Sequence, residues 1–137
     1  MLESVVIAVD AMGGDNSPNK IIAGISEYLK KNPNVFFRIF GKKRIVENEI
    51  SKYKIKNNYY ELIDCEDVVS NNDTPLTAAK KKGTSMWKAI NDVKEKKSNV
   101  IISAGNTGAL FVISKLNIEM IKNINKPALA ALWPNKI

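Results

Sequence analysis

The segment SAGNTGA, residues 103–109, lies between two apolar runs and has the composition of an anion site. Its glycines, Gly105 and Gly108, allow backbone conformations and close approaches that a side chain would block. Asn106 or Thr107 is suited to cap the helix that follows. Free N–H groups at a helix start, with the helix dipole behind them, attract anions. A strand-to-helix turn that uses glycine for packing alone would have the same sequence.

A second glycine-containing loop, DAMGGD, follows the first apolar run. Asp10 stands at the end of that run, and Gly13 and Gly14 have no side chains that would project from the loop. Asp15 could cap a turn, bind a metal or hydrogen-bond a neighbouring loop. A plain glycine turn with a capping aspartate is the alternative interpretation.

A third segment, AAKKKGTSM, brings cations and hydroxyls together. Lys80, Lys81 and Lys82 precede Gly83 and a helix start at residues 84–85. Lysines, hydroxyls and helix N–H groups in one short segment suit a phosphate or a phosphopantetheine group. A solvated charge run followed by an ordinary helix cap is the alternative.

Strands and helices that alternate along the chain must position these three segments. We predict strands at 4–9, 35–40, 59–64, 99–103 and 127–134 from apolar, β-branched runs. Alternation predicts a three-layer αβα sandwich with a mainly parallel sheet and right-handed crossovers. Ligands in such sheets bind beyond the carboxyl ends of the strands, where the loops 10–17, 65–83 and 103–108 are expected.

The intervening helices have recognisable starts and apolar faces. Ser17 is expected as an N-cap with Pro18 at the first helical position. A lysine-rich helix is predicted over 42–52, with Ile45 and Ile50 facing inward. An amphipathic helix is also predicted over 84–96, and a further helix from residue 107 onward.

Composition limits the classes of function. The 137 residues suit one domain with a real core, and the net charge is +7. Aromatic residues are not interleaved with the lysines, so nucleic-acid binding is not expected. The chain has no histidine and one cysteine, Cys65, which excludes an internal disulfide and disfavours structural zinc. No metal or cofactor is expected. The sequence shows no signal-peptide pattern and no apolar run near the ~20 residues that span a bilayer, so we expect a cytoplasmic protein.

Four motifs together resemble a known family. IAVDAMGGDNSP, DTP followed by a basic segment and TSM, SAGNTGAL, and KPALAALWP are similar in order and spacing to the PlsX family, the bacterial phosphate acyltransferases of phospholipid synthesis. The resemblance runs from about residue 5 to the end. Ala79 departs from it, because the family commonly has arginine there. Members of the family are considerably longer, so residues 1–137 are expected to be an N-terminal α/β domain without its C-terminal half.

The resemblance implies a fold, a reaction and partners. The fold would be like that of isocitrate dehydrogenase and the phosphotransacetylases. The reaction would convert an acyl group on acyl carrier protein (acyl-ACP) and inorganic phosphate to acyl phosphate and free carrier protein. The family also implies a homodimer with some peripheral membrane association.

This chemistry suits a chain without histidine. Phosphate is largely dianionic near neutrality, and a thiol with a pKa near ~8.5 leaves a thioester largely unaided. What remains is positioning and donors for the developing oxyanion. The expected catalytic residues are Asn106, Thr107 and Lys82. The expected substrate-binding or phosphate-binding residues are Asp10, Gly13, Gly14, Asp15, Ser85, Ser103, Gly105 and Gly108.

Two other functions stay open. A short-chain phosphate acyltransferase would act on acyl-CoA, although the DAMGGD loop argues for the PlsX type. A non-catalytic truncated fragment that only binds anions is the other, because the chain ends on the predicted strand 127–134 with no helices after it to cover the sheet.

Overall fold

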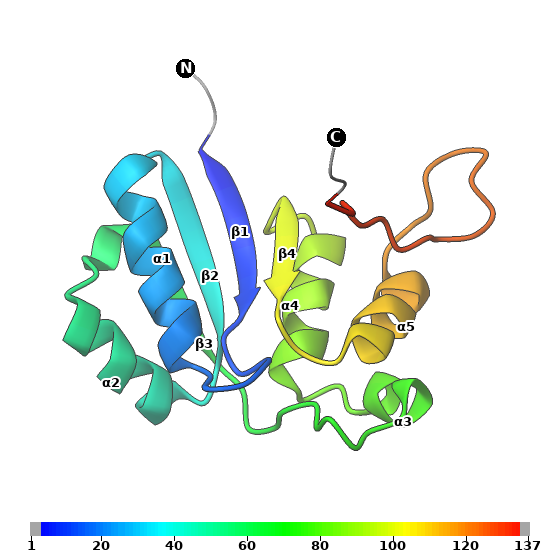
Figure 1. The fold of residues 1–137 in the computed structure, drawn as a ribbon, viewed down its shortest axis with the longest axis horizontal. Helices are drawn as coiled ribbons and strands as arrows, with labels where there is room; N and C mark the ends of the chain where they lie inside the picture. The colour runs from blue at the N-terminus through cyan, green and yellow to red at the C-terminus, as the bar shows by residue number, and fades with distance from the viewer. Residues whose placement is uncertain (1–3, 135–137) are drawn as a thin grey trace.

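A computed structural model describes residues 4–134. A four-stranded sheet, ordered β3-β2-β1-β4 with every neighbouring pair parallel, forms its centre (Figure 1). The strands are β1 (Val5–Asp10), β2 (Val35–Gly41), β3 (Tyr60–Asp64) and β4 (Val100–Ser103). The helices are α1 (Asn19–Lys31), α2 (Lys43–Tyr53), α3 (Pro75–Lys80), α4 (Ser85–Lys94) and α5 (Thr107–Asn117), with a 3-10 turn at Asn57–Tyr59. The predicted α/β fold with a parallel sheet is confirmed.

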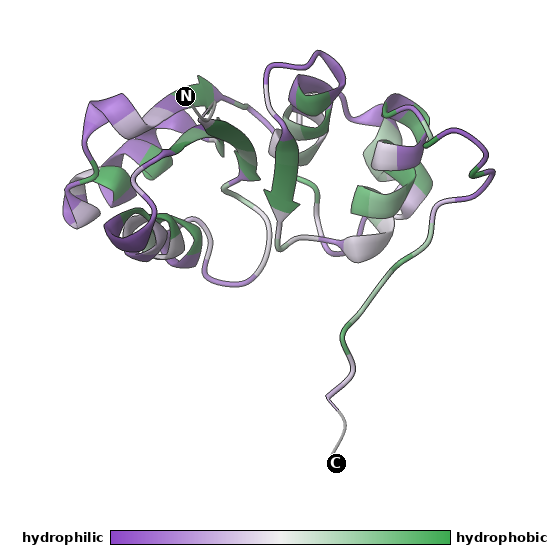
Figure 2. Ribbon diagram, turned by 90° about the horizontal axis from the view of Figure 1, so that it is seen from above, coloured by the Kyte–Doolittle hydropathy of each residue, from purple (hydrophilic) through white to green (hydrophobic). Residues whose placement is uncertain are grey.

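Side chains of the central strand alternate between the two faces of the sheet. Ile7 and Val9 of β1 pack with Ile22 and Ile25 of α1 on one face. Ala8, between them, packs on the other face in a cluster with Ala89 of α4. Figure 2 shows that the strands are hydrophobic, whereas the helices carry both hydrophobic and hydrophilic residues. Strand β1 is therefore buried on both faces, which explains its nearly continuous apolar sequence.

The register of the sheet aligns the loops that matter for function. Asp10, the last residue of β1, lies opposite Ser103, the last residue of β4. The loop after β1 and the turn after β4 thus begin side by side at the same edge of the sheet. Helix α5, which follows that turn, packs against α3 and α4 (Figure 1).

Two details of the helices differ from the prediction. Ile45 is 44% exposed, and Val46 and Ile50 are the buried residues of α2. Residues four apart share a helix face, whereas Ile45 is turned about 100° away from Val46. Ser17 does not cap α1, which begins at Asn19 after Pro18; the Ser17 hydroxyl donates to the carbonyl oxygen of Gly13 instead.

The predicted fifth strand is wrong for this structure. Residues 127–134 form no strand, and Trp133 is 89% exposed. The segment leaves the domain as an extended coil (Figures 1 and 2). Prolines at both its ends lack the N–H group that a sheet ladder requires, and β4 offers a template of only four residues. Within residues 4–134, β4 therefore has an open outer edge.

No helix among these residues combines the length and the apolar character that crossing a bilayer would require.

Candidate functional site

A buried carboxylate joins three segments at the carboxyl edge of the sheet. Asp10 is 1% exposed. Its Oδ1 accepts hydrogen bonds from the Ser85 hydroxyl at 2.6 Å and from the Met12 amide at 3.2 Å. Its Oδ2 accepts from the Ser103 hydroxyl at 2.8 Å. The end of β1, the first residue of α4 and the end of β4 are thus tied to one side chain.

The same group shapes the turn after β4. The Gly105 amide donates to the Ser103 hydroxyl oxygen at 3.2 Å. An ionised carboxylate only accepts hydrogen bonds, so both serine hydroxyls donate to it and the Ser103 oxygen is free to receive the amide. We call Asp10, Ser85, Ser103 and Gly105 the Asp10 network.

The glycines of the two loops allow the loops to pack backbone against backbone. A Cβ on Gly13 would lie 2.7 Å from Asp10 Oδ2 and 2.8 Å from the Gly105 nitrogen. Gly14 has a φ of +87°, and its Cβ would lie 2.7 Å from the carbonyl oxygen of Ala104. The structure brings Asp10, Gly13, Gly14 and Gly105 together, as the sequence predicts. Packing between the loops accounts for these glycines without a ligand.

The start of α5 is clamped by Asn106. Its Oδ1 caps the helix by accepting from the Ala109 amide at 3.0 Å, and its Nδ2 donates to the carbonyl oxygen of Asp73 at 3.1 Å. Of the two candidate caps, Asn106 is the one that the helix uses. Thr107 is exposed at the first helical position. Helix geometry leaves the amides of Thr107 and Gly108 without an acceptor inside the helix, so they can donate only to a group outside it.

Helix α3, which is not among the predicted helices, supports this turn. Thr74 caps it by accepting from the Thr77 amide at 3.2 Å, and Pro75 is its first residue. A Cβ on Gly108 would lie 3.0 Å from Pro75 Cγ, so α3 packs closely on the start of α5. Threonine followed by proline is a known helix-start signal, and the DTP motif therefore contained the information needed to find α3.

The lysines of the third segment have different surroundings. Lys81 Nζ lies 2.8 Å from Asp73 Oδ1, and this hydrogen bond, helped by the Ser70 amide, lowers the pKa of the Asp73 carboxyl. Lys82 is exposed, with its Nζ 5.9 Å from the centre of the Trp87 ring. Asp15 is exposed on the loop after β1. Lys82 and Asp15 thus lie on the surface, outside the hydrogen bonds of the Asp10 network.

Cys65 is buried at the end of β3. Burial raises the pKa of its thiol to about 11. The thiol therefore stays protonated near neutral pH, which disfavours a mechanism with a cysteine nucleophile.

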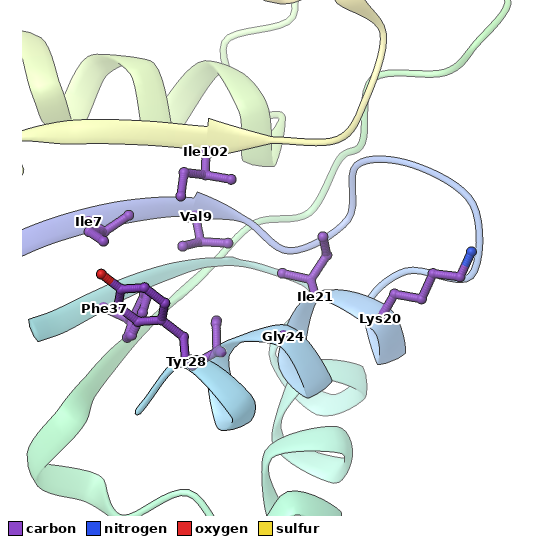
Figure 3. A pocket seen from close by; sticks show the side chains of 9 residues that line it. Ile7, Val9, Lys20, Ile21, Gly24, Tyr28, Phe37 and Ile102 are labelled. Carbon is purple, nitrogen blue, oxygen red and sulfur yellow. The ribbon is translucent and has the colours of Figure 1, made fainter. Parts of the chain in front are cut away.

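An apolar hollow of about 340 Å³ lies between α1 and the sheet (Figure 3). Ile7, Val9 and Ile102 line it from the sheet, and Ile21 and Tyr28 line it from the helix, as Figure 3 shows. None of the expected site residues lines it.

Comparison with known proteins identifies the family. The model of the family described as fatty acid synthesis protein matches residues 5–137. The chain belongs to this family.

Curated relatives in the family are named phosphate acyltransferase. The protein from Pelagibacter ubique (strain HTCC1062) is 58% identical over 137 residues, which cover 99% of this chain and 40% of the relative. The protein from Neorickettsia sennetsu is 46% identical and covers 96% of this chain and 39% of the relative. The protein from Clostridium acetobutylicum is 40% identical, with coverages of 96% and 40%. The chain thus spans about two fifths of the length of these relatives.

Proposed function

We propose that residues 1–137 are the N-terminal domain of a phosphate acyltransferase that converts acyl-ACP and inorganic phosphate to acyl phosphate and free carrier protein. The observation that carries this proposal is the match of residues 5–137 to a family whose curated relatives are named phosphate acyltransferase. We further propose that the whole protein is a cytoplasmic homodimer that associates peripherally with the membrane.

The proposed reaction is a direct attack on a thioester. A phosphate oxygen forms a bond to the acyl carbonyl carbon, the carbon–sulfur bond breaks, and the thiolate leaves and takes a proton from solvent. Near neutrality the phosphate dianion needs no general base. The protein's contribution is then to hold the two reactants together and to donate hydrogen bonds to the developing oxyanion.

The start of α5 supplies suitable donors for this task. The amides of Thr107 and Gly108, with the Thr107 hydroxyl, are proposed to bind phosphate or the reacting carbonyl oxygen, favoured by the positive end of the helix dipole. Asn106 holds these amides in place through its two hydrogen bonds. Lys82 and the Asp15 loop are proposed to contact the substrate from the surface.

An assay on the natural full-length protein tests this function. Acyl phosphate should form when acyl-ACP and phosphate are supplied together, and trapping with hydroxylamine would detect it. Formation from acyl-CoA but not from acyl-ACP would favour a short-chain enzyme instead. Phosphate binding without any turnover would contradict the proposed reaction.

A further inference from the structure

Asp10 carries a negative charge in the interior, immediately beside the turn proposed to bind an anion. Its two carboxylate oxygens together accept three hydrogen bonds from Ser85, Ser103 and Met12. A carboxylate also repels phosphate, so direct contact with this substrate would be unfavourable. Asp10 must therefore influence the site through the groups that it holds.

We propose that Asp10 is a positioning residue for phosphate binding, acting through Ser103 and Ser85. It holds the turn 103–106 against the start of α4, so that the first amides of α5 keep the orientation that binds phosphate. This role rests on the proposed function in naming phosphate as the ligand.

The direction of each hydrogen bond supports this role. The Ser103 proton points to Asp10 Oδ2, which leaves the Ser103 oxygen to accept from the Gly105 amide. Asparagine at position 10 keeps the shape of the side chain but replaces one acceptor oxygen with an NH₂ donor. One serine hydroxyl then loses the acceptor for its proton in a buried place, which is costly.

Packing leaves the turn little freedom to compensate. Gly13 fills the space between Asp10, Ser103 and the Gly105 nitrogen, where even a Cβ would be too close. On the other side, Asn106 is tied to the carbonyl oxygen of Asp73. The turn is anchored at Ser103 and at Asn106, and the amides of Thr107 and Gly108 follow directly. Loss of the first anchor should therefore misplace those amides.

The chain offers a matched control in Asp92 of α4. This carboxylate is also buried, and its Oδ2 accepts from Arg38 Nε at 2.9 Å and from the Ser98 hydroxyl at 2.5 Å. None of its partners belongs to the loops at the carboxyl edge. Asp92→Asn should destabilise the fold without affecting phosphate.

The test uses the natural full-length protein. Phosphate affinity is measured by titration calorimetry, and kcat and the KM for phosphate and for acyl-ACP are measured separately. We expect Asp10→Asn to raise the Kd and KM for phosphate about tenfold, as expected for the loss of one charge-assisted hydrogen bond, with a much smaller change in the KM for acyl-ACP. Asp92→Asn should leave the phosphate values within about twofold of the wild type, since it lowers stability alone.

A second pair of variants covers the case in which Asp10→Asn does not fold. Ser103→Thr retains the hydroxyl that links Asp10 to Gly105, whereas Ser103→Ala removes it. Ser103→Thr is expected to bind phosphate more tightly than Ser103→Ala at similar stability.

Three results would overturn the positioning role: unchanged phosphate affinity in folded Asp10→Asn, equal affinity in the two Ser103 variants, or an equal loss in Asp92→Asn. A wild-type protein that binds phosphate but forms no acyl phosphate would refute the proposed reaction alone. The loss of phosphate affinity in Asp10→Asn would then still support the positioning role.

Discussion

Two buried aspartates, Asp10 and Asp92, are held in different ways. Asp92 is 5% exposed and meets a cation, Arg38, which also pairs with Glu61 on the neighbouring strand. Asp10 is 1% exposed, and the partners that bond it are neutral hydroxyls and an amide.

This difference in hydrogen-bond partners suggests different roles: Asp92 stabilises the fold, whereas Asp10 orients groups beside the candidate site. An ion pair such as that of Asp92 joins α4 to β2 and compensates its own charge. A carboxylate among neutral donors is costlier to bury, and its benefit is the fixed orientation of every group that donates to it. Asp10, whose burial costs more free energy, is the one beside the candidate site, as is common where function requires a particular geometry.

The largest effect on stability is expected at the Asp92 ion pair. Asp92→Asn weakens the bond to Arg38 and should lower the free energy of unfolding by about 1.5–3 kcal/mol, the usual range for a hydrogen bond to a charged group. Urea denaturation with a constant m-value measures this. A decrease in the free energy of unfolding below 0.5 kcal/mol would show that Asp92 does not have the stabilising role that distinguishes it here from Asp10.

A somewhat smaller loss of stability is expected from Gly13→Ala. The added methyl would contact three atoms of the Asp10 network at 2.7–2.9 Å, so strain of about 1–3 kcal/mol and weaker phosphate binding should follow. Gly24→Ala is the control, because no atom lies within 4 Å of its new Cβ. In the α1 helix that change should stabilise by about 0.5–1 kcal/mol. Normal phosphate binding by Gly13→Ala would contradict the proposed interlock of the two loops.

Asn106→Ala should lower stability by about 1 kcal/mol, the typical value of a helix cap. It also releases the bond to the Asp73 carbonyl, so the loss of activity should exceed that of a cap far from the site. Asp64→Ala, which removes the acceptor of the Lys43 amide at the start of α2, provides that comparison, because β3 and β4 are the opposite edge strands of the sheet. Thermal unfolding and acyl phosphate formation are both measured. Equal activity in the two variants would mean that the clamp on α5 is structural only.

The smallest effect is expected at the ion pair between the exposed Lys81 and the partly buried Asp73. Because the folded pKa of Asp73 is lowered, the pair stabilises the fold above the ordinary carboxyl pKa. That contribution fades as the pH falls below about 4, through the folded pKa. Lys81→Met should therefore differ slightly from the wild type at pH 7 and converge with it in acid, as followed by urea midpoints. If the difference in urea midpoint between Lys81→Met and the wild type grew in acid, the predicted pH dependence would be wrong.

Much of the fold follows from local sequence signals. Apolar runs ending at Asp10 and Ser103 predict the parallel strands correctly, because strands buried on both faces need continuous apolar residues. The placement of Ile45 failed because Ile45 and Ile50 are five residues apart, about 140° around a helix, so only one of them can face the core. The 127–134 segment failed because an apolar run forms a strand only where a neighbour pairs with it.

The candidate site is only partly visible in the sequence. The proximity of the 10–15 and 103–106 loops follows from parallel topology. The bond between Asp10 and Ser85 does not, since it joins residues 75 positions apart through the packing of α4 on the sheet. The spacing of residues in the sequence also cannot show whether Gly13 makes room for a ligand or for the backbone of Gly105. The structure shows that it makes room for Gly105.

The bond between Asp10 and Ser103 also has a kinetic consequence, because it closes a loop of 93 residues. Contacts so distant in sequence carry a large entropic penalty during folding and form after local structure. β4 must pair with β1 before this bond can form, whereas β1 and β2 can pair much earlier. The turn 103–106 is therefore assembled late in folding, and a chain still in synthesis cannot form it until residue 103 and its neighbours have left the ribosome.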